Sequence, residues 1–353
     1  MKKIVGILAG AALLATSVFA ADVSAKVQLD GDLFNLATGD ETVAKGIMLK
    51  EYDPSGDSDY LWKLSVSGDN YGAEIWSWNI DGSVSSKKIW IKPVDAVKVT
   101  FGNIYGSSIA NPNFGWWAKT VEQSSYGYQG DFTFGALNIV AAIAPGAGNY
   151  WFDSSAADAV SKVGGFWFDA KYDLGDIGKI QLIAAKEVTV GAHGFSSWLA
   201  TDFAFGLAYA KMPWEQTGFY GDVILSMNRE GGWGRAGDVK FQGVDSQIGG
   251  QLAIDNIMLR LTNLIQYRDF NNYLGGDDKF AYGFEFKAQY KLDSVTPFLT
   301  ISGYNIMKKS MEIDLGLDTS VGGCSINAYV AVPVAFENYS FGLSVPVEFT
   351  VTF

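Results

Sequence analysis

Hydrophobic and polar residues alternate one by one along most of this chain, and the pattern is clearest at its end. The final residues place apolar side chains on one parity and mostly polar or small side chains on the other. The apolar positions are Phe341, Leu343, Val345, Val347, Phe349, Val351 and Phe353. Successive side chains of a β-strand point to opposite faces, so this pattern predicts a strand with one apolar and one polar face.

The same alternation recurs in many segments, whereas helical periodicity is almost absent. After residue 21 no apolar run is long enough for a transmembrane helix. Clear alternating segments are 26–33, 131–134, 166–172, 257–267, 279–290 and 311–318. The pattern therefore predicts an all-β protein.

The connections between these segments are alternately short and long. Short ones are 68–70, 93–96, 173–178, 255–256, 292–295 and 320–323, and long ones are 106–123, 144–164, 228–242 and 268–278. This order predicts an up-and-down antiparallel meander with tight turns at one end and long loops at the other. We expect about 18 strands. The alternative is about 16 strands, because the stretch 36–59 and the hairpin 311–336 can be divided differently.

The apolar faces of these strands need a partner, which is either a second protein layer or lipid. The apolar parity is nearly free of charge in successive strands, while the polar parity carries charges of both signs. The strand lengths, roughly 9–11 residues, suit a tilted crossing of a bilayer. Trp and Tyr are abundant, as expected of interfacial girdles. The sequence thus favours a transmembrane β-barrel with a polar lumen over a soluble secreted β protein.

Composition and motifs exclude several other classes of protein. The formal net charge of −12 argues against nucleic acid as a partner, and the single Cys324 excludes internal disulfides and thiolate zinc sites. His193 lies in GAHGFSS near Ser196, which leaves an enzyme barrel as a minor alternative to a solvated loop histidine. The stretch 53–59 is similar to calcium loops, but the EF-hand acidic position holds Leu64. A loosely calcium- or lipopolysaccharide-binding loop stays an alternative there. We expect no catalytic residue, no cofactor and no metal site.

The N-terminus has the pattern of a Sec-type signal peptide. Lys2 and Lys3 precede an apolar run over residues 4–15, and small residues end at Ala20. We therefore expect residues 1–20 to be a signal peptide and residues 21–353 to form a single barrel domain. An N-terminal membrane anchor is the alternative.

These features together resemble bacterial outer-membrane β-barrel proteins, and among them the porins. The opening ADVSAKVQLDGDLF is similar to the first strand of porin-like proteins from spirochaetes. The resemblance implies the outer membrane of a diderm bacterium, contact with its lipid, and a last strand whose Phe349, Val351 and Phe353 are the signal read by the barrel-assembly machinery. Pro346 departs from the pattern and predicts a bulge or a missing bond. General porins are often trimers, so the resemblance also leaves a homotrimer open.

In general porins the third external loop folds into the channel. By this resemblance, the loop over about 107–123 contributes the constriction residues Trp116, Trp117, Lys119 and Glu122. An exposed aromatic loop is the alternative, and loop 144–164 is a second candidate for the constriction.

Strand parity predicts which charged residues line the lumen. They are Asp30, Asp32, Glu74, Asp131, Asp169, Arg260, Glu285, Lys287, Glu312 and Asp314. Each is either a pore-lining charge or a paired residue of the wall. The acidic excess predicts mild cation preference. The expected function is a porin that lets small hydrophilic solutes or ions diffuse passively. The alternative is a non-conducting structural or adhesive outer-membrane barrel.

Overall fold

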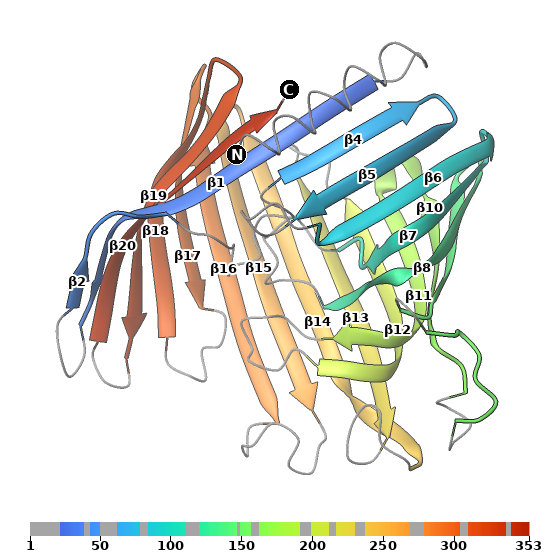
Figure 1. Ribbon diagram of the computed structural model, residues 1–353. Coiled ribbons are helices and arrows are strands. Elements are labelled where there is room, and N and C mark those ends of the chain that lie inside the picture. Colours follow the sequence, from blue (N-terminus) through green and yellow to red (C-terminus); the bar gives the residue numbers. More distant parts are fainter. Residues whose placement is uncertain are drawn as a thin grey trace.

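A computed structural model describes most of the chain. The described residues are 22–38, 43–49, 62–77, 84–110, 120–146, 149–156, 162–190, 199–211, 217–229, 237–268, 279–303, 310–336 and 340–352. Nearly all regular structure within these ranges is β-strand (Figure 1). No helix of these ranges is both long and apolar enough to cross a membrane.

The strands follow one another in a single antiparallel sheet. Their bounds are β1 (Asp22–Ala37), β2 (Val43–Lys45), β3 (Met48–Leu49), β4 (Trp62–Gly68), β5 (Tyr71–Ser77), β6 (Ser86–Val94), β7 (Val97–Ser107), β8 (Val121–Phe134), β9 (Leu137–Ala144), β10 (Gly165–Asp173), β11 (Lys179–Val190), β12 (Leu199–Lys211), β13 (Gly218–Arg229), β14 (Val239–Ile254), β15 (Ile257–Arg268), β16 (Phe280–Tyr290), β17 (Val295–Gly303), β18 (Ser310–Val321), β19 (Cys324–Ala335) and β20 (Ser340–Thr352).

The sheet closes into a barrel because its last strand pairs with its first. Val27 lies opposite Val351 and Leu29 opposite Phe349, while the other edge of β1 pairs with β4. The short strands β2 and β3 pair with β1 nearer its C-terminal end. The barrel wall therefore has 18 strands, β1 and β4–β20, which confirms the expected all-β barrel. Closure leaves no long unpaired edge in the wall.

Tight turns join the strands at one end, which we call the turn end. Two-residue turns lie at 69–70, 95–96, 135–136, 255–256 and 322–323, and a short 3-10 helix (Gly175–Ile177) lies in another connection. Asp255 has a φ of 49° and Gly322 a φ of 59°. This left-handed conformation is what two-residue hairpin turns require, so the short connections are as expected. The described strand ends that border the long connections lie at the opposite end, which we call the loop end.

The outer face of the wall is apolar, as a lipid-facing surface requires. In β14 the outward Ile248 and Leu252 are 55% and 44% exposed, whereas Gln247 and Gln251 on the other parity are 0% and 3% exposed. Outward aromatic rings also contact one another across strands, as Phe101 and Tyr128 do with centroids 5.6 Å apart. The alternation therefore separates an apolar exterior from a polar interior.

The wall changes its strand number near the loop end. There β8 pairs directly with β11, with Glu122 opposite Thr189 and Val121 opposite Val190. The hairpin of β9 and β10 ends below this contact, at Ala144 and Gly165. The two hairpin strands therefore separate β8 from β11 only over the part of the wall nearer the turn end.

The pairing of the last strand with the first is irregular next to the expected proline. It runs regularly from Thr352 to Pro346, which lies opposite Asp32, and then shifts before Ser344. Two residues of β1, Leu33 and Phe34, lie there opposite Val345 alone, so the extra residue belongs to β1. The pairing is thus irregular next to Pro346, where a bulge or a missing bond was expected, but the bulge is in the partner strand.

A glycine on β8 permits close packing of the backbone. A Cβ placed on Gly127 would lie 2.0 Å from the carbonyl oxygen of Ile143, a backbone atom that cannot rotate away. We expect Gly127→Ala to lower the free energy of unfolding in detergent by about 1–3 kcal/mol. Gly250→Ala on β14 is the matched control, because its Cβ would meet nothing closer than 3.5 Å. Equal stability of the two variants would contradict the steric argument.

Candidate functional site

The lumen wall has two unlike halves, and the first is densely packed. On β10–β15 nearly every inward side chain is buried. Examples are Trp167, Asp169, Gln181, Ile183, Asp202, Ala204, Asp222, Ile224, Asp245, Gln247, Arg260 and Thr262. Many of the polar groups are satisfied by neighbours on adjacent strands, as buried polar atoms require. We call this part the packed half.

An apolar cluster on lumen-facing positions extends from the packed half onto β7–β9. Ile104, Trp167, Ile183 and Ile224 belong to it together with alanines and valines of β8, β9, β11 and β12. A Cβ on Gly106 would lie 2.3 Å from the Trp167 ring, so the ring of β10 lies directly over β7. A water-filled interior does not require such packing, and its presence shows that this side of the lumen is closed by protein.

The described ends of the third long loop lie inside the barrel. The backbone N–H of Ile109 donates to Gln181 Oε1 at 2.7 Å, and Gln181 Nε2 donates to the Ser107 carbonyl at 3.1 Å. Ala110 packs with Ala208, Tyr220, Leu264 and Ala281, which belong to β12, β13, β15 and β16. At the other end of the loop, Thr120 Oγ1 donates to Asp222 Oδ2 at 2.5 Å. The loop therefore enters and leaves along the packed half.

Of the four residues expected at the constriction, only Glu122 is described. Trp116, Trp117 and Lys119 lie outside the described residues. Glu122 is buried where β8 meets both β7 and β11, and it shares the strand parity of the outward Tyr128. Glu122 is therefore a residue of the barrel wall and is not among the residues proposed for the constriction.

The second half of the wall, made by β16–β20, β1 and β4–β7, keeps its charged side chains partly exposed. On β4, β6 and β7 four inward lysines form what we call the basic band: Lys63, Lys88, Lys92 and Lys98. Glu74 bridges two of them, 3.1 Å from Lys63 Nζ and 2.8 Å from Lys88 Nζ. We call this half the accessible half.

Tryptophan rings accompany the lysines of the basic band. Lys88 Nζ lies 5.7 Å from the Trp76 ring centroid, while Lys92 and Lys98 lie 5.6 and 5.2 Å from the Trp90 ring. The rings attract the ammonium groups and hold them along the wall. A Cβ on Gly72 would clash with the Trp90 ring at 2.4 Å, so glycine there makes room for it.

Carboxylates gather on the neighbouring strands of the accessible half. We call Glu312, Asp314, Asp318 and Glu348, on β18 and β20, the acidic band. All four are partly exposed, and Asp318 accepts a hydrogen bond from Asn327 Nδ2 at 2.5 Å. Asp32 on β1 shares their face and is 9% exposed. The side chain of Asp30 is outside the described set, but its backbone lies opposite Glu348.

A recess of about 380 Å³ lies at the turn end of the acidic band. Asp318, Glu348, Asn327 and Thr296 line it together with residues of the turn after β16. In the described ranges no three carboxylate, histidine or cysteine side chains are placed to hold a metal ion. The recess therefore brings two carboxylates of the acidic band, Asp318 and Glu348, beside the turn.

The other residues expected in the lumen all lie on its parity, but several are held by wall partners. Glu74 is in the ion pairs above. Asp131 accepts from Gln129 at 3.2 Å, and Asp169 is bound by Trp167 and by Lys171 at 3.0 Å. Lys287 Nζ lies 4.9 Å from the Phe298 ring. Arg260 Nη2 donates to Gln251 at 3.2 Å, and Glu285 is opposite Thr262.

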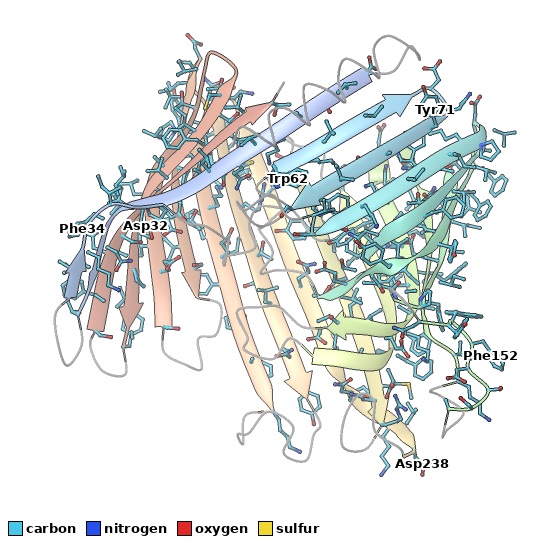
Figure 2. The ribbon with its side chains drawn as sticks, viewed as in Figure 1. Asp32, Phe34, Trp62, Tyr71, Phe152 and Asp238 are labelled. Atoms are coloured by element: carbon cyan, nitrogen blue, oxygen red, sulfur yellow. The ribbon has the colours of Figure 1, made fainter. Side chains whose placement is uncertain are left out.

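The second candidate loop does not turn inward where it is described. Phe152 and Tyr150 are 60% and 87% exposed, and Phe152 lies at the periphery of the barrel in Figure 2. Phe152 pairs with Val163, so the segment is a small hairpin extension outside the wall. His193 and the stretch 53–59 are beyond the described residues.

Sequence reasoning missed several lumen residues. Lys88 and Lys92 could not be assigned to the lumen from the sequence. Lys87 and Lys88 are adjacent, so the sequence does not decide which of them faces inward. Asp222 was missed because its strand, β13, has no charged neighbour on the same face. Asp222 is recognised as a functional candidate through its hydrogen-bond partner Thr120, which lies 102 residues earlier in the chain.

Comparisons with known proteins agree with the fold. No family model matches the chain, and no curated protein matches it in sequence. Among solved structures, Pseudomonas aeruginosa OpdQ is 8% identical with a TM-score of 0.53, covering 95% of this chain and 98% of that chain. P. aeruginosa OccK2 in complex with glucuronate is 9% identical with a TM-score of 0.52, covering 94% and 96%. A BenF-like porin from Pseudomonas fluorescens Pf-5 is 10% identical with a TM-score of 0.50, covering 94% and 99%.

The closed antiparallel barrel with an apolar exterior places this chain in the class of β-barrel membrane proteins. Its fold, along nearly the whole length, is that of bacterial outer-membrane porins. The resemblance inferred from the sequence is confirmed at the level of the fold.

Proposed function

We propose that this protein is a passive diffusion channel for small hydrophilic solutes or ions in the outer membrane of a diderm bacterium. The observation that carries the proposal is the accessible half, where two bands of opposite charge lie in the lumen of a closed, apolar-sided barrel. Such a lumen offers water and fixed charges to a passing solute. OccK2, a barrel of similar fold, was solved with glucuronate, itself a small hydrophilic molecule.

We further propose that the third loop narrows this channel and that the conducting path follows the accessible half. Support comes from Ser108–Ala110 and Thr120, which lie against the packed half. Trp116, Trp117 and Lys119 lie between these two points of the chain and are the candidates for the constriction.

We propose mild cation preference for the channel. The acidic band and Asp32 bring five carboxylates to one side, while Glu74 offsets part of the charge of the four lysines in the basic band. Fixed charges in a pore enrich the oppositely charged ion.

We also propose a signal peptide over residues 1–20, contact with outer-membrane lipid, recognition of Phe349, Val351 and Phe353 by the barrel-assembly machinery, and a homotrimer. Val351 and Phe349 belong to the strand that closes the barrel, which fits an assembly role.

Single-channel recording of the refolded protein in planar bilayers tests the function. We expect stepwise openings, and under a salt gradient a reversal potential on the cation side. Openings with an anion-side reversal would keep the channel and reject the charge assignment. A folded barrel that never conducts would favour the structural or adhesive alternative.

A further inference from the structure

Both ends of the third loop meet on one carboxylate of a strand that is not adjacent to the loop. Thr120 Oγ1, where the loop ends, donates to Asp222 Oδ2 at 2.5 Å. The hydroxyl of Ser108, where the loop begins, also forms a hydrogen bond with Asp222. Yet the loop connects β7 and β8, whereas Asp222 belongs to β13. The loop therefore reaches across several strands to a single point.

Asp222 is itself fixed by the wall. It is 3% exposed, and Gln247 of β14 donates to it twice, from the backbone N–H at 3.0 Å and from Nε2 at 3.1 Å. Ser246 of the same strand donates to the Asp222 carbonyl at 2.5 Å. Hydrogen bonds to a carboxylate are stronger than those between neutral groups, and more so when water is excluded. The wall therefore fixes the position of the Asp222 carboxylate, and the carboxylate in turn fixes the two ends of the loop.

We propose that Asp222, with Ser108 and Thr120, forms a clamp that holds the third loop inside the lumen and thereby sets the width and steadiness of the channel. This inference rests on the proposed function, because it assigns a positioning residue to the proposed constriction. Gln181 assists the clamp at the start of the loop, since it holds both Ser107 and Ile109. Asp222 acts through the loop and need not touch the solute.

The test compares Asp222→Ala and Thr120→Val with a matched control, Asp245→Ala. Asp245 is an inward carboxylate of the next strand, 2% exposed, whose amide partner is Gln266 of the wall. Loss of the clamp should raise the frequency of current transitions during single-channel recording by roughly ten- to a hundredfold, because a charged hydrogen bond no longer holds the loop. The variant that combines Asp222→Ala with Thr120→Val should be no noisier than Asp222→Ala alone, since both changes break one contact. The control variant should show the same frequency of current transitions as the unaltered protein.

Thr120→Val keeps the proposal testable if Asp222→Ala does not fold, because it removes only the hydroxyl of the loop. Wild-type steadiness in both variants would overturn the clamp while leaving the channel intact.

A second readout is independent of conduction. A cysteine introduced by Lys119→Cys, with Cys324→Ser as background, should react with a maleimide several-fold faster when Asp222 is replaced by Ala, and not when Asp245 is. If the unaltered barrel never conducts, the labelling rate still tests the clamp. A faster rate in the Asp222→Ala variant would show that Asp222 positions the loop, and an unchanged rate would reject the clamp. Failure of the proposed function is thereby separated from failure of the clamp.

Discussion

Replacing the acidic band by amides should reverse the charge preference of the channel. In the variant Glu312→Gln, Asp314→Asn, Asp318→Asn and Glu348→Gln, four negative charges leave one side of the lumen while the basic band remains. We expect the cation-to-anion permeability ratio to fall about three- to tenfold, so that the reversal potential under a salt gradient moves to the anion side. The amides keep the size of the side chains, and the amide introduced at position 318 would still face Asn327.

The matched variant neutralises the basic band by Lys63→Gln, Lys88→Gln, Lys92→Gln and Lys98→Gln. It should move the reversal potential in the opposite direction, towards cations. Both shifts should shrink at high salt, because the screening length falls from about 10 Å at 0.1 M to about 3 Å at 1 M. If both variants fold and conduct with an unchanged reversal potential, the bands do not lie on the conducting path.

The largest effect on stability is expected at a buried ion pair of the packed half. Asp202 and Arg229 are 0% and 2% exposed, and Arg229 Nη2 lies 2.6 Å from Asp202 Oδ1. Asp202 Oδ2 also accepts from the backbone N–H of Arg229 at 2.9 Å and from its Nε at 3.0 Å. Asp202→Ala should lower the free energy of unfolding by about 3–5 kcal/mol, because it removes a carboxylate that is bound to a buried guanidinium. Denaturant titration in detergent, followed by tryptophan fluorescence, measures it.

Two controls separate the charge effect from a loss of packing. Asp202→Leu combined with Arg229→Met should recover most of the loss, since neither charge of the pair remains. Asp173→Ala breaks an exposed pair, with Lys179 at 3.2 Å, and should leave the stability nearly unchanged. If Asp202→Ala lowers the free energy of unfolding no more than Asp173→Ala does, the Asp202–Arg229 pair is solvated.

The strands and turns were predictable because lipid and water enforce a strict two-residue period on a barrel wall. The phase of segments 257–267 and 279–290 is read correctly from the sequence, since β15 and β16 run in register without interruption. Turns at 255–256 and 322–323 follow from their residue types. Lumen placement of charged residues is reliable wherever the alternation is unbroken.

The prediction of which side chains face the lumen fails where a strand carries an extra residue or has no clear alternation. Glu187 has a φ of 56°, and beyond it the buried parity of β11 changes from Ala185 to Val188. Glu122 lies in VEQSS, where no apolar alternation decides its face. The contact between Thr120 and Asp222 is beyond any local pattern, because it depends on how the closed barrel brings two distant segments together. The separation into a packed and an accessible half is likewise a property of the closed wall.

The direct pairing of β8 with β11 shortens the rim at the loop end. Neighbouring strands lie about 4.8 Å apart, so the absence of two strands there removes roughly 10 Å of circumference. The wall between β8 and β11 is accordingly shorter at the loop end than at the turn end. In the proposed channel, the β9–β10 hairpin is thus a wedge that lengthens this part of the wall only on the turn side of that contact.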